Sequence, residues 1–361
     1  MEIGIVGLPL SGKTTLFNLL TRSHAETGFS SGRKKVNLGL SRVPDLRVDR
    51  LAEIWKPKKT TYATIQYVDV AGVEKGSGKE GLAGEALTSL KNTDALLVVV
   101  RAFDSEQVPH PEGSIDPLRD LELLQAEFLL SDLIIIENRL QRLAKQLKGK
   151  AERALELEQT VLQRCQECLE EERPLRLLEF SADEARCIRG FQFLTRKPLV
   201  IAVNLGEDDL GRAGEFVDAI EQRWGSPTVA TIYLSATIEQ EISELSAEDA
   251  ASFLEDLGID SSATDRIIRS SYQLLGLLSF FTMGEDECRA WTVVTGATAP
   301  QAAGVIHSDL ERGFIRAEVV HYDDFVAAGS QAACREQGLL RLEGKDYRVK
   351  DGDILNIRFN V

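Results

Sequence analysis

The residues that could do chemistry begin with a glycine-rich loop close to the N-terminus. Residues 7–14 read GLPLSGKT and come directly after the apolar run 3–6, just before a helical pattern. In the spacing G-x-x-x-x-G-K-[ST], glycines let backbone N–H groups surround an anion, and the following helix start adds the positive end of its dipole. The sequence therefore predicts a phosphate-binding loop, with Lys13 reaching the β- and γ-phosphates and Thr14 ligating Mg²⁺.

A second motif, D-x-x-G, follows the next predicted strand. Asp69 stands where a phosphate-loop enzyme holds Mg²⁺, often through water, and Gly72 stands where a backbone N–H senses the γ-phosphate. The alternative is a plain strand-ending turn. The nucleotide interpretation makes residues 72–84 a switch loop.

The residue after Gly72 bears on how water would be activated. Val73 occupies the position where many GTPases carry a glutamine that positions the attacking water, and an apolar side chain cannot do this. His110, in the loop after the third strand, is a candidate replacement. It could equally be a solvated loop residue.

The base-recognition segment is altered from the usual N-K-x-D of GTPases. Here Asn204 is followed by Leu205, and Glu207 takes the place of the aspartate. A glutamate is one methylene longer and should misplace the acceptor for guanine, and Leu205 cannot cover the base as lysine does. We therefore expect weakened guanine specificity and ATP as an accepted or preferred nucleotide. Ser235 and Ala236 match the loop whose backbone approaches the base.

Together these motifs define the predicted site. The predicted catalytic residues are Lys13, Gly72 and His110, and the predicted Mg²⁺ ligands are Thr14 and Asp69. The predicted nucleotide contacts are Gly7, Leu8, Pro9, Leu10, Ser11, Gly12, Lys13, Thr14, Thr15, Asn204, Leu205, Glu207, Ser235 and Ala236.

The elements that must position these residues alternate between strand and helix patterns. Short apolar runs at 3–6, 65–70, 95–100, 198–203 and 229–234 are separated by helical patterns such as 14–21 and 84–91. This alternation predicts an α/β domain with a mostly parallel sheet and helices on both faces.

An insertion interrupts the alternation. Residues 120–190 are strongly helical, with a break at Gly149, and predict an antiparallel helical hairpin. It could be an arm that contacts a large partner or a hairpin that packs only on itself. Cys165 and Cys168 within it have the spacing of half a zinc or redox site, but no second ligand pair is nearby, which favours helix packing.

The last part of the chain is β-rich, with predicted strands at 289–294, 314–320, 347–349 and 354–359. We expect three domains. The nucleotide-binding domain spans 1–119 and 191–275, the helical hairpin 120–190, and the C-terminal domain 276–361.

Composition limits the kinds of partner. The 361 residues carry a formal charge of −15, which argues against binding free DNA through a broadly basic surface. Five cysteines form no disulfide framework, no apolar run approaches membrane-spanning length, and the phosphate loop leaves no room for a signal peptide. These features predict a cytoplasmic protein without a membrane partner; its oligomeric state is open.

The motifs and the C-terminal stretch EDECRAWTVVTGATAPQAAGVIH at 285–307 resemble the YchF-type Obg-like ATPases, a branch of the Obg family of translation-factor P-loop NTPases, over essentially the whole chain. The resemblance implies a Mg²⁺-dependent nucleotide-hydrolysing domain, an inserted coiled-coil-like domain, a β-grasp (TGS) domain and association with ribosomes. It also implies use of ATP alongside or instead of GTP through Asn204 and Glu207, and a water-positioning role for His110.

Three positions depart from the family pattern. The phosphate loop has Leu10 and Ser11 in place of asparagine and valine, so the asparagine associated with a monovalent cation is absent and potassium stimulation is not expected. Arg33 stands where the family has a switch threonine, which predicts slow hydrolysis; Ser30 or Ser31 could substitute as ligand. Gly206 replaces the usual third residue of the base motif.

The leading hypothesis is an ATPase, with GTP as a possible second substrate, that acts as a switch on a ribosome or ribosomal subunit. The alternative is a nucleotide-sensing scaffold that binds ATP or GDP and hardly turns over. A guanine-specific GTPase is a third possibility, which fails if ATP competes as well as GTP.

Overall fold

The computed structural model describes residues 1–23, 25, 36–70, 82–105, 108–148 and 152–360. The chain divides into two compact units. The first comprises Met1–Gly39 and Gln66–Ile267, and the second comprises Leu40–Ile65 and Ile268–Val361. Each unit has its own six-stranded sheet.

The sheet of the first unit carries the predicted nucleotide loops. Its strands, in chain order, are β1 (Glu2–Val6), β2 (Asn37–Arg42), β4 (Thr64–Asp69), β5 (Ala95–Ala102), β6 (Leu199–Leu205) and β7 (Val229–Leu234). Their spatial order is β2-β4-β1-β5-β6-β7, and the neighbours from β4 to β7 run parallel. Every residue of β5 and β6 is buried, as expected for central strands covered on both faces. The predicted parallel α/β sheet is confirmed.

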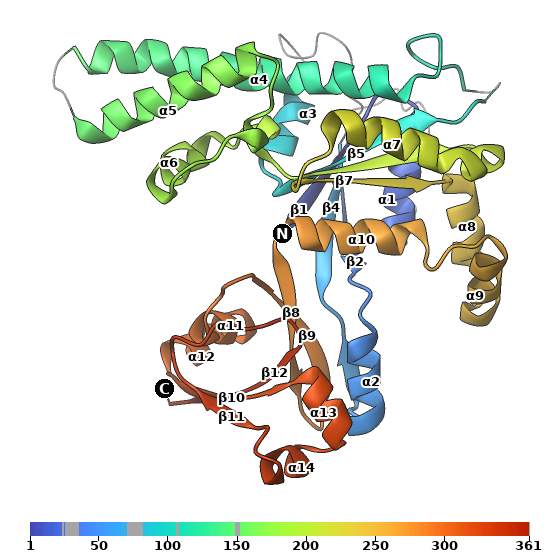
Figure 1. Ribbon diagram of the computed structural model, residues 1–361, viewed down its shortest axis with the longest axis vertical. Helices are drawn as coiled ribbons and strands as arrows, with labels where there is room; N and C mark the ends of the chain where they lie inside the picture. Colours follow the sequence, from blue (N-terminus) through green and yellow to red (C-terminus); the bar gives the residue numbers. More distant parts are fainter. Residues whose placement is uncertain (24, 26–35, 71–81, 106–107, 149–151, 361) are drawn as a thin grey trace. The chain divides into compact units, whose positions relative to one another are not determined.

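Helices cover both faces of this sheet (Figure 1). The helices in these stretches of the chain are α1 (Lys13–Thr21), α3 (Leu82–Lys91), α4 (Pro117–Gln146), α7 (Ala213–Trp224), α8 (Ala236–Glu244), α9 (Ala247–Asp256), which follows α8, and α10 (Ala263–Leu274), which continues into the second unit. Apolar residues of α3, α4 and α7 join one core cluster with alternate residues of β5 and β6. Helix α1 follows the phosphate loop on the other face.

The predicted helical hairpin is present as α4 and α5 (Arg153–Glu170), followed by α6 (Ala182–Ile188). Asp116 caps α4 by accepting a hydrogen bond from the Arg119 N–H, and Pro117 occupies the first turn, so the start of the helix is specified locally. The described part of this unit also contains short 3₁₀ helices at Leu175–Leu177, Arg189–Phe191, Leu194–Arg196 and Glu207–Arg212.

The second unit is a mixed sheet with a helix packed on one face. Its strands are β3 (Lys59–Thr61), β8 (Leu277–Met283), β9 (Glu287–Val294), β10 (Phe314–His321), β11 (Arg341–Glu343) and β12 (Asp353–Phe359), in the spatial order β11-β10-β12-β8-β9-β3. Strands β8 and β9 form an antiparallel hairpin, and β12 returns parallel to β8. This is the expected β-grasp arrangement.

The helices of the second unit are α2 (Leu46–Trp55), α11 (Ala299–Ile306), α12 (Ser308–Arg312), α13 (Tyr322–Ala328) and α14 (Gln331–Glu336). Small residues of α11 pack directly on the sheet. One prediction here is wrong: residues 347–349 form only an isolated bridge between Arg348 and Thr298. Their backbone is hydrogen-bonded to Ala297 and Ala299, at the start of α11, instead of to a strand of the sheet.

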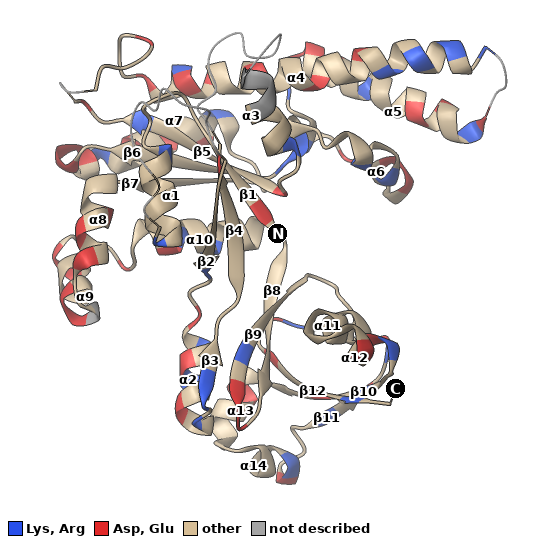
Figure 2. Ribbon diagram, turned by 180° about the vertical axis from the view of Figure 1, so that it is seen from behind, with Lys and Arg blue, Asp and Glu red and all other residues tan. Residues whose placement is uncertain are grey.

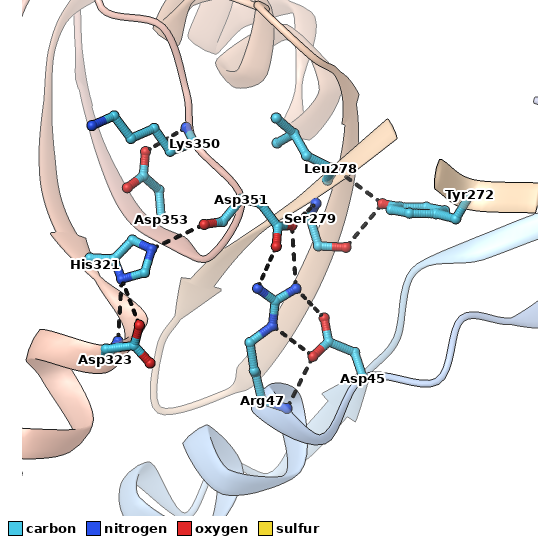
Figure 3. A network of polar contacts seen from close by, with 10 residues as sticks. All are labelled: Asp45, Arg47, Tyr272, Leu278, Ser279, His321, Asp323, Lys350, Asp351 and Asp353. Atoms are coloured by element: carbon cyan, nitrogen blue, oxygen red, sulfur yellow. Dashed lines mark hydrogen bonds and ion pairs between the residues drawn. The ribbon is translucent and has the colours of Figure 1, made fainter. Parts of the chain in front are cut away.

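The segment Leu40–Ile65 differs in placement from the sequence-based division, which assigned it to the nucleotide-binding domain. Its strand β3 pairs with β9, and its helix α2 is fixed by Arg47. Figure 3 shows the Arg47 guanidinium between two carboxylates, at 2.7 Å from Asp351 Oδ2 and 2.8 Å from Asp45 Oδ2. Asp351 in turn accepts a hydrogen bond from the Ser279 N–H at 2.9 Å. Short-range sequence patterns cannot reveal that β3 pairs with β9 or that Arg47 binds Asp351, since the partners lie over 220 residues apart in sequence.

Candidate functional site

The phosphate loop connects β1 to α1 and has the backbone geometry that its glycines permit. Gly12 has φ 95° and Leu10 has φ 63°, both left-handed. A Cβ at Gly7 would lie 2.3 Å from the Val99 carbonyl oxygen, so the loop can pass β5 only without a side chain there. Lys13 begins α1, and its Nζ donates to the Leu8 carbonyl at 2.6 Å across the loop. The ammonium and the helix start thus lie where an anion would bind.

A carboxylate from the neighbouring strand meets the start of α1. Thr14 Oγ1 donates to Asp69 Oδ2 at 3.0 Å, and Asn37 Nδ2 donates to the same oxygen at 3.2 Å. Burial raises the pKa of the Asp69 carboxyl above its usual range, while the hydrogen bonds from Asn37 and Thr14 act in the opposite direction. The strand pairing between β1 and β4 brings Asp69 beside the loop.

This donor set fits Mg²⁺. Hydroxyl and carboxylate oxygens are hard ligands, and phosphate-loop proteins add phosphate oxygens and water to one or two such protein ligands. Bound Mg²⁺ would also favour the ionised form of the buried Asp69 carboxyl. Thr14 and Asp69 therefore remain the residues that would hold the metal.

Asn204 connects the phosphate loop to the start of α8. Its Nδ2 donates to the Ser11 carbonyl at 3.2 Å, and its Oδ1 accepts from the Ala236 N–H at 3.1 Å. Ser235 is buried, and its hydroxyl has no hydrogen-bond partner within the described part of the chain. The structure thus brings together three of the predicted nucleotide segments, although Ser11 is 193 residues from Asn204 and Asn204 is 32 residues from Ala236 in sequence.

The other two residues of the base motif differ in exposure. The Leu205 side chain is 2% exposed and belongs to the apolar core, so a base could reach only its main chain without displacing that core. Glu207 begins a 3₁₀ helix and is exposed to solvent, as a base-binding carboxylate must be.

His110 is held inside its loop. Its Nδ1 accepts from the Glu112 N–H at 3.1 Å, so Nε2 carries the ring hydrogen and faces Asp120 Oδ2 at 3.0 Å. The side chain is only 5% exposed. A water-positioning role would require His110 to break its contact with Asp120. The alternative of a solvated loop residue does not agree with a side chain that is 5% exposed.

Two further residues of this region were not predicted. Asp120, in the first turn of α4, pairs with both His110 and Arg119. Arg101, 2% exposed at the end of β5, donates to the carbonyls of Phe103 and Val108 and so shapes the loop that carries His110. A charged residue ending the apolar run 95–100 was the available signal in the sequence.

Several predicted residues lie outside the described part of the chain. These are Gly72, Val73, the predicted switch loop up to residue 81, and the first-switch residues Ser30, Ser31 and Arg33. Their roles stay predictions.

The cysteine pair of the hairpin lies in its apolar core. Cys165 is fully buried and Cys168 is 4% exposed. Burial raises the pKa of the Cys165 thiol to about 12, which disfavours the thiolate that metal binding and redox chemistry need. Among the residues that the structure describes, no cluster of three or more His, Cys, Asp and Glu could hold a metal. These observations support helix packing.

Comparisons with known proteins identify the family. The model YchF-GTPase C-terminal, described as a protein of unknown function (DUF933), matches residues 277–360, and a model described as 50S ribosome-binding GTPase matches residues 2–139. The chain is 42% identical over 365 residues to the Ribosome-binding ATPase YchF of Bacillus subtilis (strain 168), covering 100% of both. The chain belongs to the YchF family.

Other members agree over the same length. The Ribosome-binding ATPase YchF of Escherichia coli O157:H7 is 41% identical over 362 residues, covering 100% of this chain and 99% of that protein. The solved structure of the Schizosaccharomyces pombe YchF GTPase superposes with a TM-score of 0.86 at 32% identity, covering 99% of this chain and 97% of that one. The resemblance inferred from the motifs is therefore confirmed, as is the architecture. Among the helices described, none is both long and apolar enough to span a bilayer.

Proposed function

We propose that this YchF-family chain is a Mg²⁺-dependent P-loop NTPase that hydrolyses ATP, accepts GTP as a second substrate, and acts as a switch on the ribosome. The observation that carries the proposal is the contact between Thr14 Oγ1 and Asp69 Oδ2 at 3.0 Å, beside Lys13 at the start of α1. It joins the phosphate loop to the metal-binding acid. The names of the relatives, Ribosome-binding ATPase YchF, support both the substrate class and the partner.

Base choice is the part of the proposal that depends on the altered motif. Asn204 is tied to Ser11 and Ala236, while Glu207 is exposed and one methylene longer than the usual aspartate. Competitive calorimetry of ATP and GTP with Mg²⁺ tests it. Tighter ATP binding supports the proposal, and a strong GTP preference would overturn the adenine part while leaving the fold untouched.

A second candidate is a nucleotide-sensing scaffold with little turnover. The observation that favours it is that both ring nitrogens of His110 are hydrogen-bonded within the protein, to Asp120 and to the Glu112 N–H. Phosphate release measured at saturating ATP separates the two functions, with Lys13→Ala as the baseline. An NTPase exceeds this baseline, and a scaffold matches it while wild-type protein still binds ATP. Repeating the assay with ribosomes tests whether the partner raises turnover.

A further inference from the structure

The tip of the helical arm formed by α4 and α5 has an unusual charge distribution. Residues 138–151 read NRLQRLAKQLKGKA, with five basic residues and no acidic one. The chain as a whole has 57 acidic residues in 361, a frequency at which 14 residues would carry about two. A local excess of cations in a protein of charge −15 needs a physical reason.

The cations of the tip do not hold the arm together. Arg142, Lys145, Lys148 and Arg153 are exposed, and none forms an ion pair with another residue of the described chain. Arg139, one turn before Arg142, behaves differently: it binds Glu158 of α5 through two hydrogen bonds of 2.6 and 2.7 Å. The spacing of three residues keeps Arg142 and Lys145 on one side of α4, and Lys148 follows two residues after the helix ends at Gln146.

The arm presents these cations away from the sheet. Helix α4 has 30 residues and is therefore about 45 Å long. Its first turns pack on the sheet through Leu124 and Phe128, whereas Ile136 and Leu143 pack only within the arm's own core. Figure 2 shows basic residues at the far end of α4, and basic beside acidic residues at the far end of α5. Rigid helices thus carry a basic tip to a distance from the nucleotide site.

We propose that this tip, defined by Arg142, Lys145, Lys148 and Arg153, docks on the phosphate backbone of RNA, specifically ribosomal RNA. This proposal rests on the proposed ribosomal function. Exposed cations without protein partners are the side chains that neutralise phosphates. A protein-binding surface would need an apolar or aromatic centre, and the one large exposed apolar residue described near this tip is Leu157, 37% exposed.

Stabilisation of the helix dipole does not account for the cluster. Basic residues in the last turn of α4 would interact favourably with its negative end, but Arg153 stands in the first turn of α5, where a positive charge is unfavourable. Because Glu152 and Glu156 flank Arg153 at that end of α5, the excess positive charge of the tip resides on Arg142, Lys145 and Lys148, which fits a polyanion.

The test compares two triple variants of the full-length protein. The tip variant is Arg142→Gln/Lys145→Gln/Lys148→Gln, since glutamine keeps helix propensity while removing charge. The matched control, Arg173→Gln/Arg186→Gln/Arg189→Gln, removes three exposed charges from the segment that follows α5. Binding to ribosomes and to protein-free ribosomal RNA is measured over a series of salt concentrations, and circular dichroism melting checks that both variants fold.

We expect the tip variant to bind both targets at least about ten-fold more weakly, and the slope of log K against log salt to fall by about two, since each lost phosphate contact removes about 0.7 to 0.9. The control should stay within about two-fold of wild type. Unchanged affinity and slope in a folded tip variant would overturn the inference. So would weaker ribosome binding with unchanged RNA binding, which would identify a protein contact. Wild-type protein that binds RNA through the tip but not ribosomes would overturn the proposed function instead.

Discussion

At the residue scale, the nucleotide site depends both on polar side chains and on glycines, which leave space where a side chain would clash. Gly12 has a left-handed backbone, and a Cβ added there would lie 2.4 Å from Asn204 Nδ2. Asn204 is the residue that links the phosphate loop to α8. A single methyl group would therefore disturb two nucleotide-binding segments together.

We predict that Gly12→Ala abolishes ATP binding and lowers the free energy of unfolding by about 2 kcal/mol or more, because it adds a clash to the cost of left-handed alanine. Calorimetry and denaturant unfolding measure both effects. Gly113→Ala is the control: Gly113 also has positive φ, 76°, but no atom lies within 4 Å of an added Cβ. It should cost about 1 kcal/mol and leave ATP affinity near that of wild type. Equal behaviour of the two variants would contradict this account.

Replacing Asp69 should have opposite effects on stability and on function, because its buried carboxylate costs stability but is predicted to hold Mg²⁺. Its raised folded-state pKa means that the ionised carboxyl costs stability at neutral pH, and this cost disappears as pH falls below the pKa of the unfolded chain. Asp69→Asn should leave the metal-free protein as stable as wild type or more stable, with a larger difference at about pH 8 than at about pH 5.

The same substitution should remove the rise in melting temperature that Mg²⁺ with ATP gives the wild-type protein, and should reduce turnover at least about 100-fold. Thermal melts with and without Mg²⁺ check the first result. A variant that keeps the Mg²⁺-dependent shift would exclude Asp69 as a metal-holding residue.

At the element scale, α2 illustrates how one arginine fixes a helix. The Arg47 side chain is 28% exposed, binds Asp45 and Asp351, and stacks on Phe281 at 5.2 Å. Burial acts to lower the pKa of its guanidinium, but the hydrogen bonds to Asp45 and Asp351 outweigh it and raise the pKa above its ordinary value. The charged form is therefore the one that this environment selects.

We expect Arg47→Met to lower the free energy of unfolding by about 2 to 3 kcal/mol, since it leaves two carboxylates without their partner. Arg50→Met on the same helix is the control. Arg50 is 55% exposed and pairs only with Glu53 on the surface, so its loss should change stability by less than about 0.5 kcal/mol. Urea unfolding of both variants measures the difference. Equal decreases in the free energy of unfolding would contradict the prediction and indicate that helix propensity alone stabilises α2.

At the scale of the whole molecule, the two units are built from interleaved stretches of chain. Leu40–Ile65 begins within β2 and ends within β4, two strands of the first sheet, but it contributes β3 and α2 to the second unit. The buried side chains Val48 and Leu51 of α2 belong to that unit. A cut after residue 275 would therefore remove the sheet on which this segment folds.

We predict that a chain ending at residue 275 aggregates or is rapidly proteolysed. A version that also replaces residues 43–63 by a short glycine-serine linker should be recovered as a folded, ATP-binding protein. The replacement is feasible because the Val43 N–H and the Ala63 carbonyl are hydrogen-bonded at 2.8 Å, so the two ends are adjacent. Gel filtration and ATP binding measure the difference. A well-behaved simple truncation would contradict the interleaved arrangement.

The sequence by itself determined the features that depend on neighbours in the chain. The phosphate loop, the apolar strands of the first sheet and the hairpin helices follow from local spacing and periodicity, and the structure agrees with them within a few residues. The short strand β3 was not predicted, and residues 347–349, which form only a bridge at Arg348, were predicted as a strand. Both errors arise because short polar segments carry little periodic signal.

Only the tertiary structure decided which distant residues meet. Strand order and long-range loop packing decide three contacts of the site. These are the hydrogen bonds of Asp69 with Thr14, of Asn204 with Ser11 and Ala236, and of His110 with Asp120. The same holds for Arg47 and Asp351, which are 304 residues apart in sequence. Such contacts are selected by the free energy of the whole packed unit, so no window of sequence contains them.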